Sequence, residues 1–175
     1  MKIPSIHPTA FIHPAAHVMG EVTLAEHVSI WPGSVLRGDI NRITIGAYTN
    51  IQELTLCHVD DDAPCTIGAY VVCGHQATLH GCTVADRCLI GIAAAVLSHV
   101  VIGPDTIIGA HSLVPEGKQL EGGYVYYGSP VKKVRRVTDQ ERAYIRQNAE
   151  RYAAGIEAYR RGEIQSARPS SMGAS

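Results

Sequence analysis

Three histidines in the middle of the chain, His58, His75 and His80, are the side chains with the clearest capacity for chemistry. Imidazole is a common metal ligand, and three protein ligands with a water in the fourth position are the usual arrangement of a catalytic zinc site. Two neutral amides, Asn50 and Gln52, precede the histidines and can hold a small oxygen-containing molecule by hydrogen bonds. Such a site forms only if the fold brings together residues that are distant along the chain.

A six-residue repeat predicts the elements that position these residues. Aliphatic residues recur at every sixth position from Ile12 to Leu36, and the same period continues to Val114 with three breaks in register. Glycine often follows the aliphatic residue, and a small or β-branched residue often lies four positions after it. A short strand buries alternate side chains, glycine permits a bend, and stacked coils bury what one coil leaves exposed. The pattern predicts a mainly β protein built of stacked coils.

This repeat resembles the hexapeptide-repeat proteins, which implies a left-handed parallel β-helix shaped like a triangular prism, with three repeats in each coil. When the two longer breaks are treated as outward loops, Arg37, His58 and His80 fall on the same side of the prism in consecutive coils. Adjacent parallel strands lie about 4.8 Å apart. His58 is therefore predicted to stack directly beside His80, with Arg37 one coil earlier, and two imidazoles at that separation can share a metal ion.

The same register places His75 on a different side of the prism, with its side chain pointing outward. One chain therefore cannot easily close a site around His58 and His80, but a neighbouring subunit can do so. A closed ring of such heterologous contacts is a homotrimer. Gln52 lies one coil before His75 on the same side, and Asn50 is close enough to orient it.

Charge and composition exclude several classes of protein. The 175 residues include 15 Lys and Arg against 16 Asp and Glu, a formal net charge of −1, which argues against a nucleic-acid partner. The longest apolar stretch, Cys88 to Leu97, is far shorter than the roughly 18 residues of a membrane span. Met1 to Phe11 lacks the apolar centre of a signal peptide, and five cysteines without a C-x-x-C pair indicate reduced, buried thiols. We expect a cytoplasmic protein with no membrane partner.

A helix is predicted after the repeats stop. Thr138 and Glu141 form a capping box, and apolar residues from Ala143 to Tyr159 recur at helical spacing. The predicted organisation is a β-helix domain with its capping segment over residues 1–137, a helix over 138–163 and a disordered tail over 164–175.

A more specific pattern combines four segments in order along the chain, namely Arg37-Gly38-Asp39, Asn50-Ile51-Gln52, His58 and Gly74-His75-Gln76-Ala77-Thr78-Leu79-His80-Gly81-Cys82. Together with the repeats, this pattern resembles the γ-class carbonic anhydrase family over roughly Ile12 to Arg136. The resemblance implies a homotrimer in which His58 and His80 bind Zn²⁺ together with His75 of the adjacent subunit. It also implies the hydration of carbon dioxide to bicarbonate.

The resemblance assigns roles to four further residues and leaves others open. It implies a salt bridge between subunits from Arg37 and Asp39, and it implies that Asn50 and Gln52 position the reacting water. The best-studied members carry a glutamate where this chain has Ile40, and a longer acidic loop with a proton-shuttling glutamate. Here the loop is short and offers Asp60 to Asp62, of which Asp61 is the candidate shuttle; a solvated loop tip is the alternative.

Other functions and other metals are compatible with the same residues. Three imidazoles also suit Fe²⁺ or Co²⁺. Similar hexapeptide proteins with the three histidines are thought to hydrolyse acyl-CoA thioesters, and a catalytically silent metal-binding trimer is a third hypothesis. Hexapeptide acyltransferases use a single general-base histidine and no metal, so three converging histidines count against that activity. The plain alternative is that the histidines are outward polar residues and that Cys57, beside His58, is a buried thiol rather than a ligand.

Overall fold

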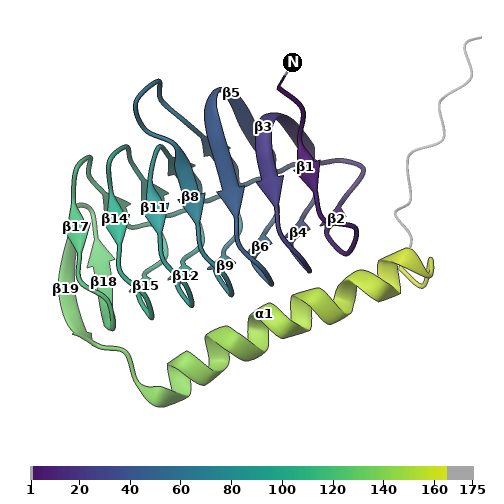
Figure 1. The fold of residues 1–175 in the computed structure, drawn as a ribbon. Coiled ribbons are helices and arrows are strands. Elements are labelled where there is room, and N and C mark those ends of the chain that lie inside the picture. Colours follow the sequence, from purple (N-terminus) through teal and green to yellow (C-terminus); the bar gives the residue numbers. More distant parts are fainter. Residues whose placement is uncertain (1, 165–175) are drawn as a thin grey trace, which may run out of the picture.

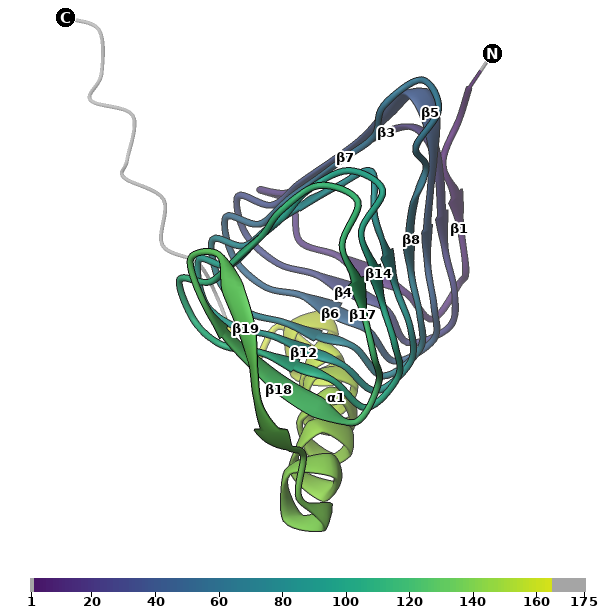
Figure 2. The ribbon, with the colours of Figure 1, turned by 90° about the vertical axis from the view of Figure 1, so that its left-hand side faces the viewer.

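The computed structural model describes residues 2–164 and shows a parallel β-helix with one long helix along its side (Figure 1). Seen along the axis, the coils outline a triangle (Figure 2). Apart from the last hairpin, the strands pair in parallel with strands of the coils before and after. The predicted parallel β-helix with a C-terminal helix is confirmed.

One sheet covers two sides of the prism. The first side carries the beginnings of two long strands and four short strands: β3 (His17–Leu24), β5 (Val35–Ile45), β7 (Leu56–His58), β10 (Thr78–His80), β13 (Ala95–Val96) and β16 (Leu113–Val114). The second side carries the ends of β3 and β5 and the strands β1 (Ser5–Ile6), β8 (Cys65–Ile67), β11 (Thr83–Val84), β14 (Val101–Ile102) and β17 (Gln119–Leu120).

The second sheet forms the third side. It contains β2 (Phe11–Ile12), β4 (Ser29–Ile30), β6 (Asn50–Ile51), β9 (Val72–Cys73), β12 (Leu89–Ile90), β15 (Ile107–Ile108), β18 (Tyr124–Gly128) and the antiparallel β19 (Val131–Arg136). Helix α1 (Asp139–Arg160) runs along this side and contacts β4, β6 and β9. The third side is therefore covered by the chain's own helix.

Helix α1 begins where the capping box predicts. The Thr138 side chain accepts from the backbone N–H of Glu141, and the Glu141 carboxylate accepts from the backbone N–H of Thr138. Ile145 and Ala149 are fully buried against Val72 of the third side. The helix ends at Arg160, three residues before the predicted end, and the Arg160 guanidinium donates to the backbone carbonyls of Thr9 and Ala10, just before β2.

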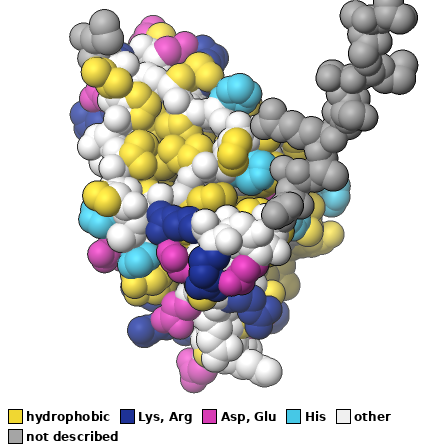
Figure 3. Space-filling view, turned by 90° about the vertical axis from the view of Figure 1, so that its right-hand side faces the viewer, with side chains coloured by type: hydrophobic (Ala, Val, Ile, Leu, Met, Phe, Trp, Pro, Cys, Tyr) yellow, Lys and Arg dark blue, Asp and Glu magenta, His cyan; other side chains and the backbone are white. Residues whose placement is uncertain are grey.

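The aliphatic residues of the repeat fill the inside of the prism. Ile30, Leu36, Ile51 and Leu79 are completely buried, whereas Ile12 and Val18 of the first repeats are partly buried. All five cysteines are free and buried, as predicted, and burial raises the pKa of Cys73 to about 12. Figure 3 looks onto the N-terminal end, where hydrophobic side chains of the first coils gather over the end of this core.

The repeat glycines serve a purpose different from the expected bend. The φ of Gly46 lies outside the left-handed region, and a Cβ there would lie 2.5 Å from the carbonyl carbon of Gly68 in the next coil. The left-handed residue that follows such a repeat glycine lies two positions later and is not itself glycine, as at Tyr48 (φ 59°) after Gly46 and Tyr70 (φ 56°) after Gly68. Glycine is therefore needed because neighbouring coils approach closely, which corrects the sequence-based reason.

Among the described residues, no helix combines the length and apolar character that spanning a bilayer requires. The predicted division into residues 1–137, 138–163 and 164–175 stays a prediction. Residues 165–175, which make up nearly all of the predicted tail, lie outside the described residues.

Candidate metal centre

His58 and His80 lie side by side, as the register predicts. They are paired residues at the ends of β7 and β10 on the first side of the prism. Nδ1 of His58 lies 3.0 Å from Nε2 of His80, and the ring centroids are 5.0 Å apart. Cys57, the neighbour of His58, points into the core and is completely buried, which fits a structural thiol.

The outer ring nitrogen of each histidine meets an acceptor. Nε2 of His58 lies 3.3 Å from Oδ1 of Asp39, and Nδ1 of His80 lies 2.9 Å from Oγ of Ser98. Ser98 in turn donates to Oδ2 of Asp60 at 2.5 Å. That hydrogen bond holds the pKa of Asp60 below its usual value, so the carboxylate is ionised at neutral pH.

This arrangement fits a bound cation. If both histidines keep their protons on the outer nitrogens, the two inner nitrogens face one another with lone pairs and no hydrogen between them. In that state the facing lone pairs repel each other at 3.0 Å, and a cation shared between them removes the repulsion; in the other tautomers one of the two nitrogens carries a proton and donates it to the other. Two nitrogens on one tetrahedral Zn²⁺, each about 2.0–2.1 Å from the metal, lie roughly 3.4 Å apart. Metal-binding histidines also commonly donate their other N–H to a carboxylate or similar acceptor.

His75 lies elsewhere on the same chain. It follows β9 at the corner between the third and first sides, whereas His58 and His80 lie at the opposite edge of the first side. Its Nδ1 donates to Oε2 of Glu53 at 2.6 Å. In residues 2–164, no three His, Cys, Asp or Glu side chains converge closely enough to hold a metal ion. One chain thus presents two potential ligands in one place and the third in another.

Gln52 lies near His75, as predicted. Both residues line a cavity of about 430 Å³ between the third side and helix α1. Nε2 of Gln52 donates to Oδ1 of Asn50 at 2.9 Å, and Asn50 is completely buried. Asn50 therefore orients the Gln52 amide and leaves its oxygen available to another group.

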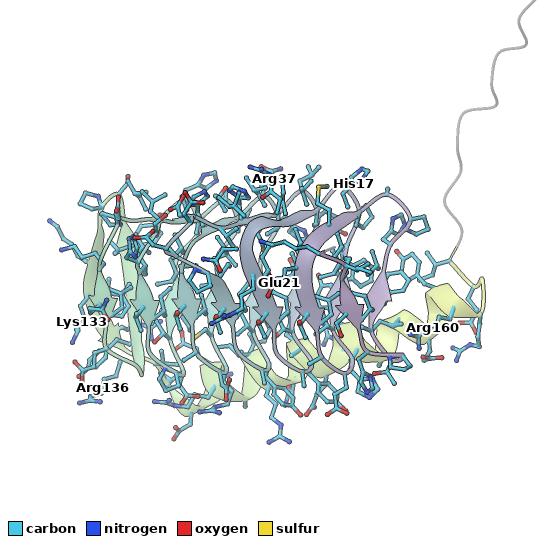
Figure 4. All side chains as sticks on the ribbon, turned by 45° about the horizontal axis from the view of Figure 1, so that its top comes forward. His17, Glu21, Arg37, Lys133, Arg136 and Arg160 are labelled. Carbon is cyan, nitrogen blue, oxygen red and sulfur yellow. The ribbon has the colours of Figure 1, made fainter. Side chains whose placement is uncertain are left out.

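Arg37 and Asp39 form an ion pair within the chain. Nη1 of Arg37 lies 2.5 Å from Oδ2 of Asp39, and Figure 4 shows Arg37 at the outer edge of the prism. Desolvation is the largest single influence and opposes ionisation of Asp39, but the hydrogen bonds from Arg37, the backbone and His58, with the charge of Arg37, together outweigh it and lower the pKa of Asp39. Arg37 thus also acts on His58 indirectly, because it holds the carboxylate that contacts Nε2. Ile40 is exposed.

The acidic loop places Asp60, rather than Asp61, beside the histidines. Nδ2 of Asn41 donates to the backbone carbonyls of both residues at 3.0 Å, which fixes the loop. The Asp60 carboxylate lies 3.5 Å from Nδ1 of His80, while the Asp61 side chain is exposed. A role of Asp61 as proton shuttle stays a prediction.

Sequence reasoning missed Ser98 and Glu53. Leu79 pairs with Val96 in the next coil, so the register could have placed Ser98 one residue beyond the neighbour of His80. Glu53 follows Gln52 and lies in the coil before His75, and the stacking that predicted the His58–His80 contact could have found it as well. The side-chain directions at these corners were the missing information.

A parallel β-helix with paired histidines at one edge defines a hexapeptide-repeat protein with a candidate metal centre. No protein-family model matches the chain. It is 42% identical over 163 residues to protein YrdA of Escherichia coli, covering 89% of both chains. It is 41% identical to the mitochondrial gamma carbonic anhydrase 2 of Arabidopsis thaliana, covering 86% of this chain and 56% of that protein. The chain belongs to the γ-carbonic anhydrase-like family of hexapeptide-repeat proteins.

Solved structures agree with this fold. A hexapeptide transferase family protein from Anaplasma phagocytophilum superposes with a TM-score of 0.86 at 36% identity, covering 89% of this chain and 92% of that chain. A putative acetyltransferase from Bacillus cereus gives a TM-score of 0.89 at 32% identity, covering 91% and 93%. The chain spans a little over half of the length of the plant relative, which is a longer protein.

Proposed function

We propose that the chain forms a homotrimer with a metal site at each subunit interface and that it hydrates carbon dioxide to bicarbonate. The observation that carries the proposal is the arrangement of His58 and His80, with inner nitrogens 3.0 Å apart and outer nitrogens held by acceptors. Relatives named gamma carbonic anhydrase, at about 40% identity, support the reaction class.

The outward side chains favour the first side of the prism as the interface. Helix α1 packs over the third side. The outward side chains of the second side form a row of mainly threonine residues: Thr23, Thr44, Thr66, Thr83, Val101 and Gln119. The corresponding row of the first side begins with His17 and is more apolar beyond it: Val35, Leu56, Thr78, Ala95 and Leu113. Leu56 is 38% exposed in the single chain. An apolar surface that remains exposed in the single chain is typical of a subunit interface.

The ends of the first side supply the two halves of the site. His75 lies at the edge where its strands begin, and His58 and His80 lie at the edge where they end. A heterologous contact that joins the beginning edge of one subunit to the ending edge of the next brings three imidazoles together. Because the contact joins different edges, it repeats from subunit to subunit, and in the proposed assembly it closes after three subunits, which completes three sites.

The residues of the chain have separate tasks in this proposal. Zn²⁺, or alternatively Fe²⁺ or Co²⁺, held by His58, His80 and the neighbour's His75, supplies the Lewis acidity that makes a hydroxide nucleophile available near neutral pH. Gln52, held by Asn50, offers its amide oxygen for a hydrogen bond that orients the reacting water. The ionised Asp60 carboxylate accepts a proton near the histidines and passes it to buffer; Asp61 at the loop tip extends that route. Five free cysteines favour a cytoplasmic location.

The test measures zinc content and carbon dioxide hydration on the same preparations. The zinc-loaded wild-type protein should hydrate carbon dioxide, and Gln52→Ala should keep its zinc but lose activity by about 10- to 100-fold, since one hydrogen bond around the metal site is removed. His80→Ala should lose its zinc. Full stoichiometric zinc in purified His80→Ala would show that the ligand assignment is wrong, and a loaded, inactive wild type would refute the hydration activity.

The cavity beside His75 favours a second candidate, hydrolysis of acyl-CoA thioesters. Its apolar walls include Val72, Leu89 and Ile107, and its volume of about 430 Å³ far exceeds what carbon dioxide needs. Oδ1 of Asn148, at its edge, has no hydrogen-bond partner among the described residues. If the cavity holds an acyl chain, Ala110→Trp should lower thioester hydrolysis and leave carbon dioxide hydration unchanged. A trimer that binds Zn²⁺ and catalyses neither reaction supports a silent metal-binding protein instead.

A further inference from the structure

A chain of two hydrogen bonds leads from His80 to a carboxylate of the acidic loop. Nδ1 of His80 contacts Oγ of Ser98 at 2.9 Å, and Oγ of Ser98 contacts Oδ2 of Asp60 at 2.5 Å. Ser98 is only 8% exposed, so the first of these bonds is largely sheltered from water. Asn41 holds the backbone of Asp60 in place through its carbonyl, which keeps the carboxylate in reach of Ser98.

The number of hydrogens in this chain determines which nitrogen of His80 is protonated. An ionised carboxylate can only accept, so Ser98 must donate its single hydroxyl hydrogen to Asp60. The Ser98 oxygen can then only accept from His80, which requires the proton to be on Nδ1. Nε2 of His80 is left with its lone pair, and Nε2 is the nitrogen that faces His58.

We propose that Ser98 and Asp60 are positioning residues that hold His80 in the Nδ1–H tautomer and so keep Nε2 available as a metal ligand. Without Ser98, the proton of a neutral His80 can move to Nε2 and be donated to Nδ1 of His58, which lies at hydrogen-bond distance. That alternative satisfies both rings internally and removes one ligand. The metal-binding part of this inference rests on the proposed function, whereas the tautomer itself does not.

The tautomer can be measured in metal-free protein. Proton–nitrogen correlation spectra of the histidine-labelled protein at pH about 8.5, two units above the ordinary histidine pKa, distinguish an Nδ1–H from an Nε2–H ring. Wild type and Ser98→Thr, which keeps the hydroxyl, should show His80 with the proton on Nδ1. Ser98→Ala should move a substantial fraction to Nε2–H. An unchanged tautomer in a folded Ser98→Ala protein would overturn the proposal.

Zn²⁺ affinity provides an independent measurement by competition with a chromophoric chelator. Removal of an outer hydrogen-bond partner of a ligand typically costs 10- to 100-fold in affinity, and we expect this loss for Ser98→Ala and Asp60→Ala. Asp61→Ala is the matched control, because Asp61 contacts Asn41 through its backbone carbonyl, which alanine keeps. The Zn²⁺ affinities of Asp61→Ala and Ser98→Thr should both stay within about threefold of the wild-type affinity. Equal losses in Asp60→Ala and Asp61→Ala would overturn the role of Asp60. Failure of wild type to bind Zn²⁺ would refute the proposed function, while the tautomer measurement would still decide the inference.

Discussion

Mixing two variants that each lack one proposed ligand tests whether the proposed metal site is shared between subunits. His75→Ala removes the ligand at one edge of the first side, and His80→Ala removes a ligand at the other edge. Neither variant alone can build a complete site. In a mixed trimer, however, an intact His58–His80 pair of a His75→Ala subunit can face the intact His75 of a His80→Ala subunit.

The expected amount of restored metal follows from the proposed closed ring of three heterologous contacts. Every mixed trimer, whichever variant is in excess, contains one interface with the complete set of ligands. Random assembly of equal amounts therefore restores about one site in four, and mixed trimers isolated with two affinity tags should carry about one Zn²⁺ each. The measurement is elemental analysis after co-expression and dialysis, with carbon dioxide hydration on the same samples.

A matched mixture separates shared sites from simple reassembly. His58→Ala mixed with His80→Ala should restore no zinc, because no subunit in that mixture has both neighbouring histidines intact. If the His75→Ala and His80→Ala mixture also bound no more zinc than either variant alone, with trimers still formed, the shared-site reasoning would be refuted. Equal restoration in both mixtures would likewise contradict it.

Three further predictions concern the interface, the helix cap and the core. Leu56→Arg should weaken trimer association by about 2 kcal/mol or more, whereas Thr66→Arg on the threonine-rich side should leave the trimer intact. Light scattering measures the oligomeric state of both variants. If Leu56→Arg stays trimeric as Thr66→Arg does, the interface lies elsewhere. The guanidinium of Arg135 and the backbone N–H at Thr138 lower the pKa of Glu141 from 4.5 to about 2. The stability contributed by ionised Glu141 is therefore present above pH 4.5 and lost as the pH falls toward 2. Glu141→Gln should reduce the fall in melting temperature between pH 4.5 and about pH 2, measured by thermal unfolding at a series of pH values. If the melting temperature of the variant falls as steeply as that of wild type, other groups cause the loss of stability. None of the five cysteines should react with a thiol reagent in the folded protein, because all are buried and the pKa of Cys73 and Cys88 is raised to about 12; reaction of any thiol without unfolding would contradict this.

The repeat in the sequence determined the architecture and half of the candidate site. A six-residue period has one simple physical solution, a short strand followed by a turn, and uniform stacking of such coils then pairs residues at a constant spacing. For this reason the neighbours His58 and His80, and the separation of His75 from them, were predictable without coordinates. The capping box at Thr138 was predictable because its two hydrogen bonds are local.

Only the tertiary structure decided which groups contact the outer nitrogens of the histidines and which side of the prism stays uncovered. Asp39, Glu53 and Ser98 approach their histidines at corners and loops, where the period stops and side-chain direction depends on the neighbouring coil. The same holds for the repeat glycines, whose small size is required by the close approach of the next coil. The helix has one apolar stripe and three sides to choose from, and packing of Ile145 against Val72 selects the third. Local periodicity specifies how a coil is built, but contacts between distant coils specify the chemistry at its edges.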